Sequence, residues 1–98
     1  MTIKNTLRRV RSTSRFKKEL RQSRKQGRDI ALAEKIVTML ANDEPLPPKY
    51  RDHALSGNWV GFRECHIAPD WLLVYFKSDN DGLLLVLARL ASHSQLDF

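Results

Sequence analysis

Three prolines within four positions, Pro45, Pro47 and Pro48, divide this chain into two parts that cannot share one regular element. Proline fixes φ and lacks a backbone N–H, so a helix cannot continue through this segment. The part before it is rich in Lys, Arg, Glu, Gln and Ala, which favour helices. The part after it is rich in aromatic and β-branched residues, which favour strands. Helices followed by strands predict an α+β fold.

The first expected helix lies in the basic part of the chain. Ser14 is the expected N-cap, and the segment that follows lacks Gly and Pro until about Gln26. Phe16 and Leu20 stand four residues apart and give this helix a narrow apolar stripe. Gly27 is the expected C-cap, because glycine adopts the left-handed conformation that ends many helices.

The second expected helix begins at Asp29, whose carboxylate suits an N-cap. It ends at residues 42–44, just before the prolines. Its apolar residues recur at helical spacing and form one face, which comprises Ile30, Ala33, Ile36, Val37 and Leu40. The two helices therefore predict a helical hairpin that packs on another element.

Three strands are expected after the prolines. Residues 59–67 alternate loosely, residues 71–77 are almost continuously apolar and so central, and residues 83–90 form a further buried strand. Turn-forming residues at 68–70 and 78–82 connect them, which predicts an antiparallel meander. We expect the helical hairpin to cover one face of this small antiparallel sheet and the opposite face to be available to a substrate.

A chain of 98 residues fits a single domain, expected over residues 1–98. Residues 6–11 could add a strand to the edge of the sheet, and residues 1–6 could be a flexible basic arm. Cys65 is the sole cysteine, so no intrachain disulfide can form. This cysteine usage, with no apolar signal segment and no apolar run of about 18 residues, predicts a cytoplasmic protein without a membrane span.

Positive charge is concentrated at the start of the chain. Residues 1–28 contain eleven Lys or Arg and one acid, Glu19, whereas the whole chain has a net charge of +6. A basic segment joined to a mildly acidic remainder predicts a polyanionic partner, either a nucleic acid or an acidic protein. The alternative is a helix whose charges are simply solvated.

Three histidines, His53, His66 and His93, follow the prolines, and each lies near the boundary of an expected strand. Imidazole is the side chain best able to exchange protons near neutral pH. An antiparallel meander can bring these boundaries to one edge or face of the sheet. RNA supplies its own nucleophile, the ribose 2′-hydroxyl, so histidines beside a basic surface favour proton-transfer chemistry on RNA.

Metal and nucleotide-cofactor sites have less support. The chain has no HxH, HxxH or CxxC pair, and Cys65 and His66 are adjacent, so on a strand they point to opposite faces. The four glycines are scattered and form no phosphate-binding loop. We therefore expect no metal ion and no cofactor.

Two blocks of sequence carry a family resemblance. The first is Asp52-His53-Ala54-Leu55-Ser56-Gly57-Asn58-Trp59, and the second is His66-Ile67-Ala68-Pro69-Asp70-Trp71. In this order and spacing they resemble the YafQ family of the RelE-like toxins of type II toxin–antitoxin systems. The resemblance covers nearly the whole chain and implies a RelE-like microbial RNase fold.

The resemblance also implies an activity and partners. The expected activity is ribosome-dependent cleavage of mRNA in the A site, by metal-independent acid–base attack of the ribose 2′-hydroxyl, which inhibits translation. The expected partners are the ribosome, mRNA and a cognate antitoxin that neutralises the toxin. The toxin–antitoxin hetero-oligomer would bind operator DNA through the antitoxin.

The family's site residues fall on named positions of this chain. Its catalytic residues match His53, His66, Asp70 and His93, and an active-site aromatic matches Trp71. Its terminal aromatic matches Phe98 only when Asp97 is treated as an additional residue. Arg63 is expected to contact a phosphate. The expected RNA and ribosome docking surface comprises Arg8, Arg9, Arg11, Arg15, Lys17, Lys18, Arg21, Arg24 and Lys25.

A second hypothesis is a non-catalytic basic module that binds RNA or a partner protein. It keeps the charge of the first helix and needs none of the histidines, each of which would then satisfy a loop hydrogen bond. Replacing the histidines separates the two hypotheses, since only the enzyme would lose its effect.

Overall fold

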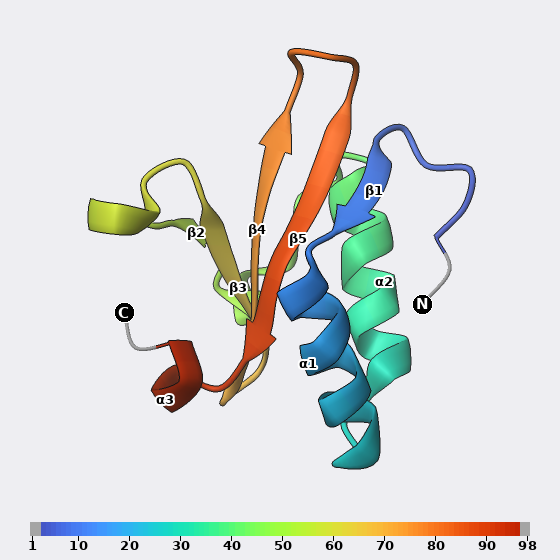
Figure 1. The fold of residues 1–98 in the computed structure, drawn as a ribbon. Helices are drawn as coiled ribbons and strands as arrows, with labels where there is room; N and C mark the ends of the chain where they lie inside the picture. Colours follow the sequence, from blue (N-terminus) through green and yellow to red (C-terminus); the bar gives the residue numbers. More distant parts are fainter. Residues whose placement is uncertain (1–2, 97–98) are drawn as a thin grey trace.

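The computed structural model describes residues 3–96, and the α+β class is confirmed (Figure 1). Its helices are α1, α2 and the short α3, and its strands are β1 to β5. Two single turns of 3-10 helix lie between α2 and β3. In chain order the elements are β1 Arg9–Ser12, α1 Ser14–Lys25, α2 Ile30–Ala41, a 3-10 turn Pro48–Tyr50, β2 His53–Ala54, a 3-10 turn Gly57–Trp59, β3 Arg63–Ala68, β4 Trp71–Ser78, β5 Leu84–Ala91 and α3 His93–Leu96.

The sheet is mixed, with the strand order β1-β5-β4-β3-β2, so the expectation of an antiparallel sheet was only partly right. Strands β2 to β5 form the antiparallel part, whereas β1 pairs with β5 in parallel. The edge strand expected near residues 6–11 is thus present at Arg9–Ser12. Its direction could not be derived from the sequence, because β1 and its partner lie more than 70 positions apart and no local pattern links them.

Both faces of the sheet are covered, but by different elements. Phe16 of α1 and Ile36 of α2 belong to one core cluster with Cys65, Leu73 and Tyr75 of the sheet. On the other face, the buried residues of β4 and β5 pack against Leu96 of α3 and against Leu55, Trp59 and Phe62 of the segment between β2 and β3. The face expected to be free for a substrate is therefore partly occupied by the chain itself.

Helix α1 is capped by the residue before the expected one. The Thr13 hydroxyl accepts a hydrogen bond from the Phe16 amide at 3.0 Å, and the Thr13 amide donates to the Leu87 carbonyl of β5 at 3.0 Å. Thr13 therefore ends the pairing of β1 with β5 and starts the helix, which explains why it replaces Ser14 as the cap.

The other expected helix ends are confirmed. Gly27 has φ +77°, and the amides of Gly27 and Arg28 donate to the carbonyls of Arg24 and Ser23, which is the Schellman arrangement. The Asp29 carboxylate accepts from the Leu32 amide at 3.0 Å and caps α2. Within residues 3–96 no helix has the length and apolar character needed to cross a membrane.

The strand expected at residues 59–67 begins later, at Arg63. Gly57 and Gly61 have φ of +62° and +92°, and the chain between them folds into a 3-10 turn instead of an extended strand. His53, which precedes the first strand expected from the sequence, lies in the two-residue strand β2, which pairs with the start of β3. The sequence pattern missed β2 because two residues are too few to show alternation.

Arg8 is buried and does not belong to the docking surface expected from the sequence. Its side chain is 8% exposed, and its Nε and Nη1 atoms lie 2.7 Å from carboxylate oxygens of Asp43 and Asp79, respectively. Lys77 also contacts Asp43, at 2.7 Å. The cluster joins the residue before β1 to the loop after α2 and to the end of β4, so Arg8 stabilises the fold at a point where three segments meet.

Replacing Arg8 tests this role. We expect Arg8→Ala to lower the free energy of unfolding in urea by about 2 kcal/mol, because it removes hydrogen bonds between charged groups at a largely buried guanidinium. Arg9→Ala, the exposed neighbour, is the matched control and should change stability by less than about 0.5 kcal/mol. Equal stability of the two variants would contradict the role of Arg8.

The same cluster predicts a pH dependence. Hydrogen bonds from Arg8 and Lys77 lower the pKa of Asp43 from 3.8 to about 2. A depressed carboxyl pKa adds stability that is present above the ordinary pKa and is lost as the pH falls through the folded value. We expect wild-type stability to fall between about pH 4 and pH 2 more steeply than that of Arg8→Ala, measured by urea unfolding at each pH.

Candidate active site

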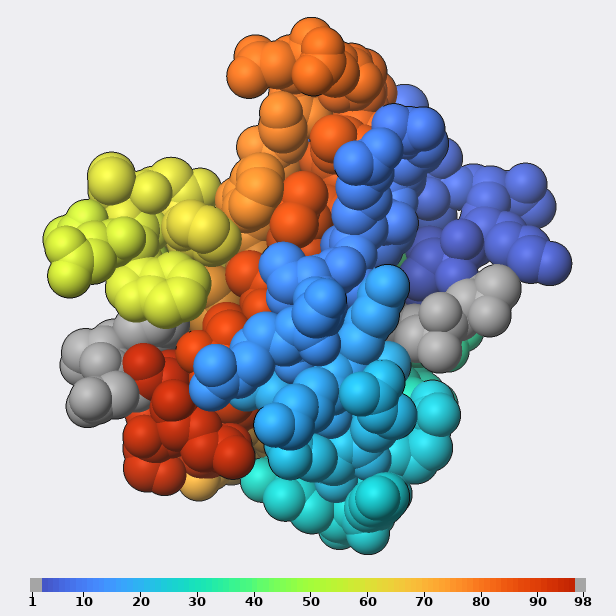
Figure 2. Space-filling view, viewed as in Figure 1, coloured from blue at the N-terminus to red at the C-terminus, as the bar shows by residue number. Residues whose placement is uncertain are grey.

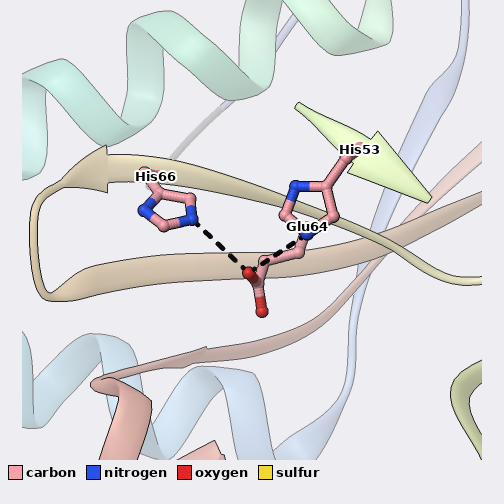
Figure 3. A group of neighbouring side chains, drawn as sticks. All are labelled: His53, Glu64 and His66. Atoms are coloured by element: carbon pink, nitrogen blue, oxygen red, sulfur yellow. Dashed lines mark ion pairs between the residues drawn. The ribbon is translucent and has the colours of Figure 1, made fainter. Parts of the chain in front are cut away.

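The pairing of β2, β3 and β4 brings His53, Glu64 and His66 to one face of the sheet. His53 lies opposite Glu64, and paired residues share a face. His66 follows Glu64 by two positions and so points the same way. Figure 3 shows the two imidazoles converging on the carboxylate. The Nε2 atoms of His53 and His66 each lie 3.5 Å from Oε1 of Glu64.

His93 and Asp70 extend this group at the end of the sheet. His66 pairs with Leu72, and Leu72 pairs with Ala91, so β5 ends beside His66 and His93 starts α3 two residues later. Oδ1 of Asp70 accepts hydrogen bonds from the His93 amide at 2.9 Å and from His93 Nδ1 at 2.8 Å. The rings of His66 and His93 lie 5.4 Å apart, and those of His53 and His66 lie 6.2 Å apart. All four expected catalytic residues are thus brought together.

Glu64 is the residue of this group that the sequence argument missed. It is 5% exposed, and its Oε2 atom has no hydrogen-bond partner among the described residues. A buried carboxylate is costly unless it is paired or bonded. The available signal was the spacing of Glu64 and His66, since alternation on a strand gives these residues the same face.

The loop that carries His53 is fixed by its neighbours. The Asp52 carboxylate accepts from the Tyr75 hydroxyl at 2.6 Å and from Arg63 Nε at 3.3 Å. Arg51 adopts φ +49°, and its carbonyl lies 2.7 Å from His53 Nδ1. A carbonyl can only accept, so Nδ1 of His53 carries a proton, and whenever the ring is neutral the lone pair is on Nε2.

The protonation states of two site residues are biased by their surroundings. Burial lowers the pKa of His66, and the neighbouring His93, Arg51 and His53 add to this, while Glu64 opposes it. Hydrogen bonds from the backbone and then the side chain of His93 lower the pKa of Asp70. At neutral pH His66 is therefore mostly neutral and can accept a proton, and the Asp70 carboxylate is charged.

The same side chains could hold a metal ion. The available ligand atoms of His53, Glu64 and His66 all lie within 4.8 Å of one another. Metal-ligand pairs formed by histidine and cysteine are absent from the sequence, but Glu64 and His66 of β3 form a Glu-x-His pair whose side chains share one face. Cys65 between them is buried on the helix-covered face, and burial raises the pKa of its thiol to about 12.

Comparison with known proteins assigns the chain to a family. Residues 8–97 match the family described as "Bacterial toxin of type II toxin-antitoxin system, YafQ". The chain belongs to the YafQ family. It is 33% identical over 88 residues to the mRNA interferase toxin YafQ of Escherichia coli K12, an alignment that covers 89% of this chain and 92% of that protein.

The fold is similar to two solved toxin structures. The E. coli DinJ–YafQ toxin–antitoxin complex contains a chain with a TM-score of 0.82 and 33% identity, and the match covers 92% of this chain and 97% of that one. A metal-bound toxin from Helicobacter pylori has a TM-score of 0.84 and 44% identity, with 90% of this chain and 97% of that chain covered.

Two residues that the YafQ resemblance and the sequence assigned to substrate binding lie elsewhere. Trp71 is 2% exposed, its Nε1 donates to Ser23 Oγ at 3.1 Å, and Arg28 lies over its ring. It is a core residue, and its buried ring cannot stack on a base. Arg63 contacts Asp52 and shares the face of Cys65, so it points away from the histidines. Phe98 lies outside the described residues.

The other eight residues of the expected docking surface are exposed. Figure 2 shows β1 and α1, in blue, as one surface beside β5 and α3, in red. A groove of about 410 Å³ between α1 and α3 is lined by Arg15, Lys18 and Gln95. The exposed basic residues that remain are Arg9, Arg11, Arg15, Lys17, Lys18, Arg21, Arg24 and Lys25. The basic surface therefore reaches α3, which begins with His93.

The contact between Asp70 and His93 predicts the tautomer of His93. In the wild type, Nδ1 should carry the proton because the charged carboxylate accepts from it. In Asp70→Ala, neutral His93 should shift toward the Nε2–H form that is usual for free imidazole. Two-bond 1H–15N NMR spectra of the histidine rings distinguish the two forms.

His53 supplies the internal control for this measurement. Its Nδ1 faces a backbone carbonyl, so its tautomer should be the same in the wild type and in Asp70→Ala. An Nε2–H tautomer of neutral His93 in the wild type would show that Asp70 does not orient the ring.

Proposed function

We propose that this chain is the toxin of a type II toxin–antitoxin system and an endoribonuclease that cleaves mRNA on the ribosome. The observation that supports this best is the convergence of His53, His66 and His93 with Asp70 in a member of the YafQ family. RNA cleavage through the 2′-hydroxyl needs a base, an acid and charge stabilisation. These side chains supply all three kinds of group.

The proposed reaction is a transesterification in which His66 and His93 share the proton transfers. One imidazole removes the proton of the 2′-hydroxyl, and the 2′-oxygen forms a bond to phosphorus. The bond from phosphorus to the 5′-oxygen breaks, and the other histidine donates a proton to that oxygen. The products are a 2′,3′-cyclic phosphate and a 5′-hydroxyl, and no redox change or metal ion is required.

Asp70 and His53 have supporting roles in this proposal. Asp70 stabilises the positively charged form of His93 through the 2.8 Å contact at Nδ1, which leaves Nε2 directed to the substrate. His53 lies on the far side of His66 and is 46% exposed, so it can reach the phosphate. Asp70 acts through His93 and His53 acts on the phosphate, so replacing Asp70 and replacing His53 should affect catalysis differently.

The partners follow from surface charge and from a relative. The exposed basic residues of β1 and α1 suit contacts with ribosomal RNA, whose phosphates attract Lys and Arg. The E. coli YafQ toxin is found in a complex with DinJ. By analogy, a cognate antitoxin neutralises this chain, and the complex binds operator DNA through the antitoxin.

Translation in a reconstituted system tests the activity. The purified chain should cut mRNA at fixed positions within codons, mapped by primer extension, and His93→Ala or His66→Ala should slow cleavage about 10²- to 10⁴-fold. Lys35→Ala, an exposed change on α2, is the control and should cut like the wild type. Circular dichroism establishes that each variant is folded.

Omitting ribosomes, or removing transition metals while retaining magnesium, tests the two finer parts of the proposal. Cleavage should require the ribosome and should survive removal of the transition metals. Intact mRNA together with tight RNA binding would instead support the non-catalytic binding module.

We further propose that His53, Glu64 and His66 bind a divalent transition metal ion and that this binding inhibits the nuclease. Ligands of a tetrahedral ion at about 2 Å lie about 3.3 Å apart, close to the 3.5 Å between Oε1 of Glu64 and each Nε2. Oε2 of Glu64, which has no partner in the described part of the chain, offers a further ligand atom. Imidazole and carboxylate suit Zn²⁺ and Cu²⁺. A relative from H. pylori is metal-bound.

Calorimetry with Zn²⁺ and Cu²⁺ spectroscopy test this without relying on activity. Glu64→Gln should weaken binding at least about tenfold, since it removes the charged ligand. Glu44→Gln, an exposed change in the loop after α2, is the matched control. Binding that is equal in wild type and Glu64→Gln would exclude this site, and cleavage unchanged with Zn²⁺ bound would exclude the inhibition.

A further inference from the structure

A cavity of about 500 Å³ lies beside the histidines, and most of its lining residues have no role in the functions described above. His66 and His93 form part of its wall, and the rest comes from segments that precede β2 and follow β3. Leu32, Ala68 and Pro69 supply apolar surface. A site of this size and mixed lining is typical of a small-molecule or single-nucleotide pocket.

Two cationic side chains, Lys49 and Arg51, line the same cavity. The Lys49 ammonium lies 5.1 Å from the centre of the ring of Tyr50, which also lines the cavity. Within residues 3–96 neither Lys49 nor Arg51 forms an ion pair, whereas Arg63 pairs with Asp52 close by. Both cations are exposed and free to meet an anionic ligand.

The position of Arg51 is fixed by the same contact that orients His53. Its left-handed backbone, at φ +49°, directs the carbonyl to His53 Nδ1, and its amide donates to the Pro48 carbonyl at 3.0 Å. Such a conformation costs a residue other than glycine about 1 kcal/mol or more and is found preferentially at functional sites. Arg51 is also among the charges that act on His66.

We propose that this cavity is a nucleotide-binding subsite in which Lys49 and Arg51 hold an RNA phosphate and Leu32, Ala68 and Pro69 contact the base. The proposal rests on the proposed nuclease function, because the subsite would fix the RNA next to the reacting phosphodiester. The cations bind a phosphate and the apolar wall accepts a base, so a nucleotide of the substrate is the ligand that satisfies both. Lys49 and Arg51 are then binding residues, distinct from the acid and base.

Adenosine 3′-monophosphate is a suitable probe, with adenosine as the matched ligand that lacks the phosphate. By calorimetry, the nucleotide should bind the wild type at least about tenfold more tightly than adenosine does, since charge-assisted hydrogen bonds are strong. Lys49→Ala and Arg51→Asn should each reduce nucleotide affinity about tenfold, and Lys35→Ala should not. Asparagine tolerates the left-handed backbone at position 51, so Arg51→Asn should keep the loop conformation. Lys49 lies in the regular 3-10 turn. If one substitution disturbs the local backbone, the other variant still tests the subsite.

Kinetics and NMR complete the test. In ribosome-dependent cleavage, Lys49→Ala and Arg51→Asn should raise KM with kcat within about threefold of the wild type, as expected for residues that bind but do not react. Chemical-shift changes on titration with the nucleotide should centre on Ile67 and Ala68. Equal affinity in all variants, or shifts confined to α1, would overturn the subsite. Nucleotide binding as predicted without any mRNA cleavage would overturn the nuclease and support the subsite.

Discussion

Strand β4 is buried along five consecutive residues, Trp71 to Tyr75, and both layers of the protein depend on it. Its odd-numbered side chains pack under α1 and α2, and its even-numbered ones pack under α3 and the loop before β3. A strand buried on both faces has a fixed register, because a slip by one residue would exchange the two sets of side chains. That register sets β3 and β5 relative to each other, and with them His66 and His93.

The active-site group places a buried carboxylate where packing alone would favour an apolar residue. Glu64 pairs with Val74, which is fully buried, yet it directs one oxygen to two imidazoles, and its other oxygen has no hydrogen-bond partner within residues 3–96. Such an arrangement is costly for stability and suits a site that must accept something further, such as a substrate group or an ion. The neighbouring ion pair of Asp52 with Arg63 is structural and keeps the loop of His53 in place.

Charge has two separate uses in this molecule. Arg8 and Arg89 are largely enclosed and bind acidic partners, Arg8 with Asp43 and Arg89 with Glu19 of α1, whose carboxylate also accepts from the Leu90 amide. These contacts fasten β1 and α1 to the rest of the sheet. The Lys and Arg residues within β1 and α1 are exposed, so the positive surface is made of residues other than the two largely enclosed, paired arginines.

Local sequence determined the elements whose signals lie within a few residues. The prolines separated helices from strands, Asp29 and Gly27 set helix ends, and the apolar run of β4 identified the central strand. The histidines and Asp70 were found by residue type and by the family motif. Tertiary structure alone decided what depends on distant partners. The parallel pairing of β1, the burial of Arg8 and Trp71, and the meeting of His93 with His66 each arise from contacts between segments far apart in the chain, which no local pattern encodes.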